Sequence, residues 1–443
     1  MSGGIRQVGG PLRVGIAGLG TVGGGTYTVL TRNAAEIRRR TGRDILVSAV
    51  ADLDQEKART LTQGQCKVYS DAADMVSNAD IDVVVELIGG YGFAKTLVEH
   101  ALRSGKSVVT ANKALLAVHG NELFALAREH GVSIGYEASV AGGIPIIKAM
   151  REGLAANRIE SVAGIINGTT NFILSEMRSK GLSFDDVLAE AQRLGYAEAD
   201  PTFDVEGIDA AHKISLLASS AFGIELSFSK AHIEGIRGLQ AVDIRYAEQL
   251  GYRVKLLGIT KRSPEGIELR VHPTLVPESL LLANVEGAMN AVQVVGDAVG
   301  TTLHYGKGAG AEPTASAVVA DLIDLCRRPT DAALAVPALG FQDNCLEEVP
   351  VLPIAQVRTG FYLRMGVRDE PGVLADITRR LADRGISIDA FIQRPREEPQ
   401  DHTDVIIVTH PCLERDLRLA LAELVQLPSI LEQTVTLRVE HFA

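Results

Sequence analysis

The stretch LRVGIAGLGTVG at residues 12–23 indicates the fold of the first part of the chain. It reads as an apolar strand followed at once by three glycines and the start of a helix. In this order the first glycine allows a tight turn, the second lets a pyrophosphate approach the backbone, and the third lets helix and strand pack closely. Free N–H groups at a helix start attract phosphate. We therefore predict a dinucleotide site formed by Gly18, Leu19, Gly20, Thr21, Val22 and Gly23.

Short apolar runs alternate with helical stretches from residue 12 to about residue 137. The expected strands cover residues 12–17, 46–51, 82–88, 107–110 and 133–136. The expected helices cover residues 22–39, 55–63, 92–104 and 120–130. Because parallel strands need a long return connection, this rhythm predicts an α/β Rossmann-type parallel sheet over residues 10–137. A glycine pattern is weak by itself in a chain with 44 glycines, but its place in the first βα turn favours a cofactor site over a structural turn.

Three further segments follow this sheet. Residues 138–330 alternate less regularly, which predicts an α+β substrate-binding and dimerisation domain. A helix near residues 312–327 is apolar around most of its circumference, and we expect it to be buried and to complete the first domain. Residues 331–357 are rich in proline and indicate a linker, and residues 358–443 predict a βαββαβ, ferredoxin-like unit large enough to fold independently.

Bulk composition restricts the possible partners and location. The formal net charge of −11 argues against nucleic acid or an anionic membrane surface as a partner. The four cysteines form no CxxC pair, which is typical of reduced thiols in a reducing compartment. The sequence contains no apolar run of about 18 residues and no secretory signal, so we expect a cytoplasmic protein.

The residues alone do not decide between NAD and NADP. Asp52 ends the second expected strand and would favour NAD by binding the ribose hydroxyls. Arg40, its neighbours in 38–43, and Lys57 could instead surround a 2′-phosphate, although each could also be a solvated helix end. The balance favours NADP, with Arg40 assigned to the cofactor site.

Candidate catalytic residues occur in two places: directly after one of the expected strands, and near the start of a later expected helix. Lys113 comes directly after the strand at residues 107–110, near the edge where substrates of such sheets bind. Asp209 and Lys213 are four residues apart on an expected helix, hence on one face, where an acid could hold an ammonium in place. The alternatives are a surface cation and an exposed ion pair. Glu198 lies in a nearby loop that Pro201 keeps extended, and Asp204 follows this loop.

Several longer motifs resemble those of the homoserine dehydrogenases over residues 10–330. They are the glycine turn, ANK at 111–113, YEASVAGGIP at 136–145, NGTTN at 167–171, GYAEADP at 195–201 with Asp209 and Lys213, and GAGAEPT at 308–314. The resemblance implies reversible NAD(P)H-dependent reduction of L-aspartate 4-semialdehyde to L-homoserine, on the way to threonine, methionine and isoleucine.

The resemblance also implies residue roles. Lys213 would be the catalytic acid/base, Lys113 a second active-site lysine, and Asp209 the residue that orients Lys213; which lysine donates the proton stays open. The implied substrate-binding residues are Glu198, Asp204 and Lys213, and the implied cofactor residues beyond the turn are Lys113, Gly195 and Gly310.

A monovalent cation, usually sodium, is implied by the same resemblance. Its positions in this chain are Glu137, Val140, Gly142 and Ile144. Backbone carbonyls suit a hard cation but leave no side-chain pattern, so the residues alone are equally typical of a glycine-rich turn.

The segment VRDEPGVLADI at 367–377, with GISI at 385–388, resembles the ACT domain. This implies an amino-acid effector, threonine in this context, held by Asp369 and by the backbone around Gly372 at a helix start. The alternative is a dimerisation module that binds nothing. Pairing of such modules implies a homodimer or homotetramer.

Two other functions compete with this interpretation. One is a different NAD(P)-dependent dehydrogenase of amino-acid metabolism, and the other is a non-catalytic amino-acid sensor that keeps a nucleotide-binding fold. The presence of both lysines and both carboxylates argues against the sensor. We also expect no fused aspartate kinase, because no kinase-like segment precedes residue 12.

Overall fold

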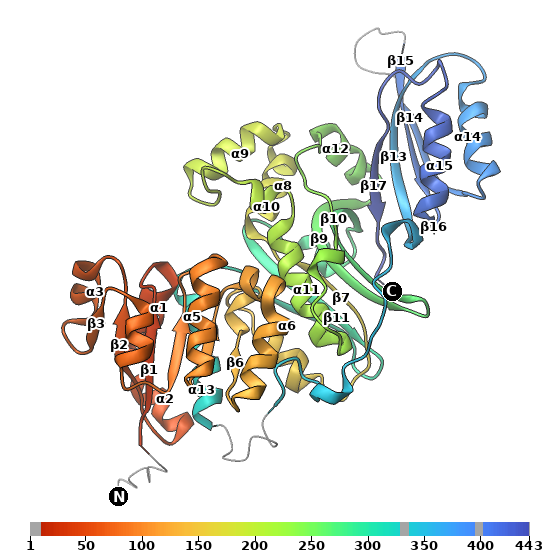
Figure 1. Ribbon diagram of the computed structural model, residues 1–443. Coiled ribbons are helices and arrows are strands. Elements are labelled where there is room, and N and C mark those ends of the chain that lie inside the picture. Colours follow the sequence, from red (N-terminus) through yellow and green to blue (C-terminus); the bar gives the residue numbers. More distant parts are fainter. Residues whose placement is uncertain (1–9, 328–335, 395–401, 443) are drawn as a thin grey trace, which may run out of the picture. The chain divides into compact units, whose positions relative to one another are not determined.

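The computed structural model describes residues 10–327, 336–394 and 402–442 (Figure 1). The chain divides into two compact units: unit 1 comprises Met1–Val162, His212–Ser229 and Met289–Val349, and unit 2 comprises Ala163–Ala211, Lys230–Ala288 and Pro350–Ala443. Residues 1–9, residues 328–335 around the start of the expected linker, residues 395–401 of the expected loop, and residue 443 lie outside the described residues. The four domain boundaries expected from the sequence stay predictions. Within the described parts, no helix has the length and apolar character needed to cross a membrane.

Unit 1 contains a six-stranded sheet in the order β3-β2-β1-β4-β5-β6, and every pairing in it is parallel. The strands are β1 (Leu12–Ala17), β2 (Ile45–Ala51), β3 (Lys67–Tyr69), β4 (Val83–Glu86), β5 (Ser107–Thr110) and β6 (Ile134–Gly135). The expected Rossmann-type sheet is confirmed. The strand order reverses between β1 and β4, the position where ligands of such sheets bind.

Crossover helices connect these strands (Figure 1). They are α1 (Thr21–Arg32), α2 (Ala34–Thr41), α3 (Gln55–Thr62), α4 (Ala72–Asn78), α5 (Gly92–Arg103) and α6 (Lys113–Glu129). The single helix expected over residues 22–39 is wrong, because the helix stops at Asn33, which leaves helical geometry with φ −101° and ψ 13°. The expected start of the last of these helices at residue 120 is also wrong: α6 begins seven residues earlier, at Lys113, and Asn112 caps it through Oδ1, which accepts the N–H of Leu115 at 3.1 Å.

Helix α13 (Ala311–Arg327) belongs to the same core as this sheet. Val318 and Leu322 are fully buried in one apolar cluster with Ile16 of β1 and Leu30 of α1. A Cβ at Gly25 of α1 would lie 2.6 Å from the carbonyl oxygen of Ala311, so a glycine is needed for this close approach. The helix expected near residues 312–327 therefore packs against α1.

The remainder of unit 1 includes an antiparallel hairpin and several short helical turns. The hairpin joins β11 (Met289–Gly296) to β12 (Gly300–Lys307). The strand β12 was not expected, since its sequence GTTLHYGK is polar and most of it is exposed or half-buried. The turns are η1 (Glu137–Ser139), α7 (Ile146–Lys148) and η2 (Ala149–Gly153). Helix α11 (Ile208–Phe222) and strand β7 (Ile159–Ile165) continue from one unit into the other.

Unit 2 contains strands in the hydrogen-bonded order β9-β10-β17-β13-β15-β14. They are β9 (Tyr252–Ser263), β10 (Gly266–Pro277), β13 (Arg358–Arg368), β14 (Ile388–Arg394), β15 (His402–Thr409) and β17 (Val435–Val439). Helices α14 (Val373–Asp383) and α15 (Glu414–Leu424) pack their apolar residues on β13 in a second core. The expected C-terminal βαββαβ unit is confirmed.

This C-terminal unit is not separate from the rest of unit 2. Strand β17 pairs with β10 in parallel through Thr274 opposite Arg438 and Leu275 opposite Val439. Arg270 of β10, with a side chain 2% exposed, donates to Glu440 at 2.5 Å. Removing this unit would therefore take one carboxylate partner from the buried Arg270, and the independent folding of the unit stays a prediction.

Unit 2 also contains several helices and two short strands, of which β8 pairs with β10 and β16 pairs with β13. They are α8 (Gly168–Lys180), α9 (Phe184–Arg193), α10 (Thr202–Val205), β8 (His232–Ile233), α12 (Ala241–Gln249) and β16 (Cys412–Leu413). Helix α12 is tied to the C-terminal unit by Asp243, which is fully buried and accepts from Arg364 Nε at 2.6 Å and from the Tyr362 hydroxyl at 3.0 Å.

Candidate active site

Each glycine of the turn after β1 meets a different geometric need. Gly18 has a φ of +90°, a conformation that side chains disfavour. A Cβ on Gly23 would overlap the carbonyl oxygen of Gly18, so α1 can pack this closely only on a glycine. A Cβ on Gly20 would meet nothing within 4 Å, and this residue is exposed. The open side of the turn at Gly20 is therefore the side from which a pyrophosphate can approach.

Asp52 braces this turn. Its Oδ2 accepts the N–H of Leu19 at 2.6 Å and its Oδ1 accepts the N–H of Asp54 at 2.9 Å. The carboxylate was expected to bind the ribose hydroxyls. In the structure it is held by two backbone donors at the carboxyl ends of β1 and β2.

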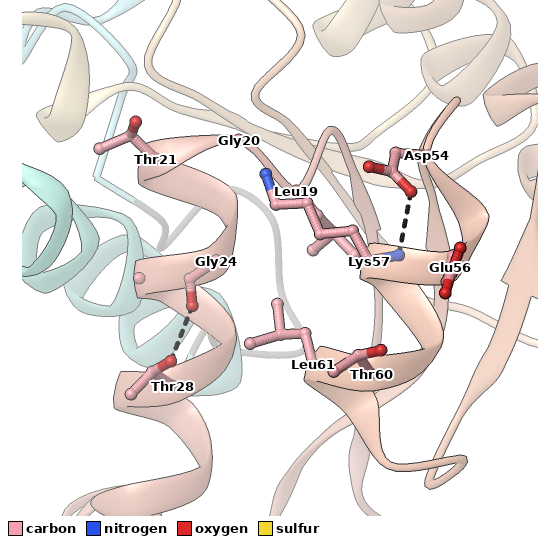
Figure 2. Close-up of a pocket in the computed structure, with 11 residues that line it drawn as sticks. Leu19, Gly20, Thr21, Gly24, Thr28, Asp54, Glu56, Lys57, Thr60 and Leu61 are labelled. Carbon is pink, nitrogen blue, oxygen red and sulfur yellow. Dashed lines mark hydrogen bonds between the residues drawn. The ribbon is translucent and has the colours of Figure 1, made fainter.

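A hollow of about 680 Å³ opens beside the turn, between α1 and α3 (Figure 2). This size is in the range of cofactor and ligand sites. It is lined by Leu19, Gly20, Thr21, Gly24, Gly25, Thr28, Asp54, Glu56, Lys57, Thr60 and Leu61. Asp54 caps α3 by accepting the N–H of Lys57 at 3.0 Å, as the dashed line in Figure 2 marks. Lys57 is the one cationic side chain among these lining residues.

Arg40 lies away from this hollow. Arg40 is near the end of α2, just before the N-terminal end of β2 at Ile45. The glycine turn instead follows the C-terminal end of the neighbouring strand β1. Because Leu12 pairs with Ile45, the six-residue length of β1, roughly 17 Å at 3.3 Å per residue, separates the two positions. Arg40 donates to Glu36 at 3.0 Å and is exposed. This placement argues against the prediction that Arg40 binds the cofactor.

Lys113 is the first residue of α6 and is half-buried. The preceding residue, Asn112, is buried; its Nδ2 donates to the carbonyl of Gly90 at 2.7 Å, besides capping the helix. Lys113 thus sits on a rigid helix start at the carboxyl edge of the sheet. Gly310, with a φ of +126°, directly precedes α13, whose first residue packs on Gly25 in the lining of the hollow.

The loop expected to hold a cation is tightly folded and mostly buried. Ala141 and Gly142 have positive φ values of +53° and +47°, and a Cβ on Gly142 would overlap the carbonyl of Gly308. Within the described residues, no hydrogen bond reaches the carbonyl oxygen of Val140 or Gly142. The carbonyls of Glu137 and Ile144 accept one N–H each, at 3.4 and 2.8 Å. Two buried carbonyls without donors fit a hard cation.

Two buried carboxyl groups support this loop. Both oxygens of Glu137 accept backbone N–H groups, from Ile147 at 2.9 Å and Lys148 at 2.8 Å. Asp321 of α13 accepts the N–H of Glu137 at 2.9 Å. Burial raises the pKa of Glu137 to about 7 and that of Asp321 to about 8. Groups of three or more His, Cys, Asp or Glu side chains arranged for a metal do not occur in the described part of the chain.

In unit 2, Asn167 joins two carboxylates. Its Nδ2 donates to Asp204 at 2.7 Å and to Asp209 at 2.8 Å, while its Oδ1 accepts the N–H of Thr170 and so caps α8. Asn167 and Asp209 are buried and Asp204 is half-buried. The sequence motif NGTTN pointed to this segment but gave Asn167 no role; an amide as helix cap after a buried strand was the only local signal.

Glu198 and Gly195 lie in an exposed loop between α9 and α10. The loop is fastened by Tyr196, whose ring stacks on Phe172 at 4.6 Å and whose carbonyl accepts from Thr169 Oγ1 at 2.7 Å. Glu198 therefore stands on a loop attached to the NGTTN helix.

Lys213 is 9% exposed and lies four residues after Asp209 on α11, as expected. A lysine this buried has lost most of its water, and a nearby carboxylate keeps such an ammonium charged.

At the C-terminal unit, Asp369 is exposed, and Gly372 caps α14 with a φ of +96° and open space beside it. The start of this helix is thus open on the side of Gly372.

Comparison with known proteins agrees with these features. The profile of the NAD-binding domain of homoserine dehydrogenase matches residues 18–137, that of homoserine dehydrogenase matches residues 145–323, and that of the ACT domain matches residues 361–429. A homoserine dehydrogenase of Pseudomonas aeruginosa is 57% identical over 97% of this chain and 99% of its own length.

Solved structures agree as well. The crystal structure of a homoserine dehydrogenase from Thiobacillus denitrificans is 58% identical, has a TM-score of 0.93 and covers 98% of this chain and 99% of its own. A hyperthermophilic archaeal homoserine dehydrogenase in complex with NADPH is 28% identical, with a TM-score of 0.62 over 72% of this chain and 99% of its own.

Proposed function

This chain belongs to the homoserine dehydrogenase family and is an NAD(P)-dependent oxidoreductase with a C-terminal ACT domain, and from this membership we propose how its residues work. Its reaction is the reversible reduction of L-aspartate 4-semialdehyde to L-homoserine. The observation that carries the residue assignment is the clustering of Asp204 and Asp209 around Asn167 at the start of the helix that bears Lys213.

We assign proton transfer to Lys213. When bound, NAD(P)H would supply a hydride to the aldehyde carbon, which would leave negative charge on the aldehyde oxygen. The Lys213 ammonium stabilises this charge and donates its proton. Asp209, one helical turn earlier, orients Lys213 and keeps it charged, and Lys113 supplies a second cation to the substrate.

We propose that carboxylates of the site bind the amino group of the substrate. Two carboxylates held on one amide nitrogen concentrate negative charge, which favours an ammonium ligand. Asp204 and Glu198 are the carboxylates proposed to bind it. Asn167 would keep Asp204 and Asp209 in their places, because it donates to both.

We propose that the cofactor is NADP(H). The glycine turn and its open side at Gly20 fit a pyrophosphate, and Gly195 and Gly310 complete the proposed set. Lys57 in the hollow beside the turn is the cation suited to a 2′-phosphate. The NADPH complex of the archaeal homoserine dehydrogenase supports this choice.

We propose that a sodium ion binds the loop at residues 137–144, held by carbonyl oxygens of Glu137, Val140, Gly142 and Ile144. The support is the pair of buried carbonyls of Val140 and Gly142 without donors among the described residues. When bound, the ion would fix the loop that follows the last strand of the cofactor sheet.

We propose that threonine is the effector of the ACT domain and inhibits the enzyme. Asp369 would bind its ammonium and the helix start at Gly372 its carboxylate. A homodimer or homotetramer in the cytoplasm is the proposed setting, serving threonine and methionine synthesis.

The test of the proposed function is an absorbance assay of nicotinamide reduction with L-homoserine, run with NAD+ and with NADP+, and with sodium replaced by a bulky organic cation. The proposal expects turnover that is faster with NADP+ at low cofactor concentration, that falls without sodium and that threonine inhibits. Each of these outcomes is scored separately, so the cofactor, cation and effector assignments can fail one at a time.

A further inference from the structure

A buried carboxylate at the end of β4 has no role in the chemistry described so far. Glu86 is the last residue of β4 and is fully buried. Its Oε1 accepts the N–H groups of Ile88 at 2.9 Å and Gly89 at 3.0 Å, and its Oε2 accepts the Thr110 hydroxyl at 2.7 Å. Glu86 thus receives three hydrogen bonds, two from the loop that follows β4 and one from the end of β5.

Thr110 connects Glu86 to the segment that precedes Lys113. It ends β5, faces Glu86 in the parallel register, and is fully buried. Its Oγ1 accepts the N–H of Asn112 at 2.9 Å, and Asn112 caps the helix that begins with Lys113. The position of Lys113 therefore depends on a chain of bonds that starts at Glu86.

The same carboxylate also acts on the cofactor side. The segment that it holds packs on the glycine turn: a Cβ on Gly18 would lie 2.8 Å from the Leu87 carbonyl and 3.2 Å from the Ile88 nitrogen. The Thr110 carbonyl accepts Ser139 Oγ at 3.1 Å, which fastens the turn after β6. Loops from β4, β5 and β6 are thus fixed to one another beside the turn.

From these contacts we propose that Glu86 is a positioning residue for the dehydrogenase site: acting through Thr110 and Asn112, it sets the place of Lys113 against the cofactor. The proposal rests on the proposed role of Lys113. All three hydrogen bonds are accepted by the two carboxylate oxygens of Glu86. Supporting groups of this kind typically change rates by about 10- to 100-fold when lost.

Thr110→Val and Thr110→Ser are the matched test. Valine keeps the shape of threonine but removes the hydroxyl, so the link from Glu86 to Asn112 is lost while the bonds to Ile88 and Gly89 stay. Serine keeps the hydroxyl. We expect Thr110→Val to lower kcat at least about tenfold, with the Kd for NADP+ changed less than about threefold, and Thr110→Ser to restore kcat to within about threefold of wild type.

A double-mutant cycle with Lys113→Ala separates positioning from general damage. If Thr110 acts through Lys113, Thr110→Val costs about tenfold in the wild-type background and little in the Lys113→Ala background. Equal losses in both backgrounds, or a Thr110→Val enzyme with wild-type kcat, overturn the proposal.

The cycle also distinguishes the two hypotheses. Full activity of Lys113→Ala refutes the role proposed for Lys113 itself, whatever Thr110 does. Where Thr110→Val yields no folded protein by circular dichroism, Glu86→Gln takes its place in the same cycle, because glutamine keeps the volume and can still accept from Ile88 and Gly89.

Discussion

The guanidinium of Arg438 donates hydrogen bonds of 2.7 and 2.9 Å to the two carboxylate oxygens of Glu234. Arg438 lies in β17 of the C-terminal βαββαβ unit and also donates to Glu414 at 2.8 Å. The segment after Glu234 packs on the substrate side, since the N–H of Ile236 donates to the carbonyl of Val205 at 2.8 Å. Val205 directly follows Asp204, so strand β17 and a proposed substrate carboxylate are joined by consecutive contacts.

Replacing Arg438 should weaken the protein and its regulation together. Arg438→Met leaves Glu414, whose side chain is 3% exposed, short of its buried cation, and we expect a loss of about 3 kcal/mol in unfolding free energy by urea titration. The exposed Arg418, which also pairs with Glu414, is the control, and Arg418→Met should cost less than about 1 kcal/mol. A weaker response to threonine is expected for Arg438→Met only. Equal stability losses for the two variants would contradict this reasoning.

The difference in stability between wild type and Arg438→Met should depend on pH. Burial raises the pKa of Glu234, but hydrogen bonds from His232 and Arg438 outweigh it and hold the pKa well below its usual range. A carboxylate with a depressed pKa stabilises the fold above its unfolded pKa of about 4.3 and loses that contribution as the pH falls further. Urea titrations should therefore give a full difference near pH 7 and a shrinking one below about pH 4. A constant difference across this range would exclude Glu234 as the titrating group.

Asp369 should determine the response to the effector. Asp369→Asn removes the charge proposed to bind the threonine ammonium, and we expect the threonine concentration for half-inhibition to rise at least about tenfold. Asp376→Asn, an exposed substitution on α14, is the control and should leave that concentration within about twofold. Isothermal titration with threonine measures the binding directly. Unchanged inhibition of Asp369→Asn would remove Asp369 from the effector site.

Two glycines of the turn should respond in opposite ways. Gly20→Val adds a side chain into open space, so we expect a melting temperature close to wild type but a loss of at least about 100-fold in cofactor affinity. In Gly23→Ala, by contrast, the new Cβ overlaps the carbonyl of Gly18, and the protein should be strongly destabilised. Thermal unfolding and fluorescence titration with NADPH check both. Normal NADPH binding by Gly20→Val would place the cofactor elsewhere.

Cofactor choice should depend on Lys57 and not on Arg40. Lys57 lines the hollow beside the turn, while Arg40 pairs with Glu36 before β2 begins. Lys57→Ala should lower kcat/KM for NADP+ about tenfold or more and leave that for NAD+ within about threefold. Arg40→Ala is the matched control, with both values near wild type. A loss specific to Arg40→Ala would reverse the assignment.

The sequence predicted the cofactor sheet well because its signals are local. Apolar runs such as residues 12–17 and 107–110 are strands buried on both faces, and their bounds agree with β1 and β5. The break at Asn33 was missed because the apolar periodicity continues through it, and only the backbone at that residue departs from the helix.

Long-range pairings leave no such signal. Nothing in residues 435–439 indicates that β17 pairs with β10, since the partner of a strand is chosen by tertiary packing. The buried pair of Arg270 and Glu440 is separated by 170 residues. For the same reason the clustering of Asp204 and Asp209 on Asn167 could not be read from spacing.

The candidate site was predicted unevenly. The glycine turn and the acidic segment came from motifs, and the structure gives each glycine of the turn a distinct geometric reason. Every residue has a backbone carbonyl, so the residue types at Val140 and Gly142 give no sign of a cation site. Only the resemblance to a known family could indicate it. Glu86 was overlooked because a single carboxylate inside the expected strand at 82–88 gives no local sign of the groups that it binds.

The most direct test of the central claim is kcat for L-homoserine oxidation by Lys213→Ala at saturating NADP+, with NADPH binding measured on the same sample. Because the ammonium on α11 is proposed to exchange the proton with the substrate oxygen, kcat should fall about a thousandfold while the Kd for NADPH stays within about threefold. The exposed Lys261→Ala should keep wild-type values. A Lys213→Ala enzyme with kcat within about threefold of wild type would contradict the proposed mechanism.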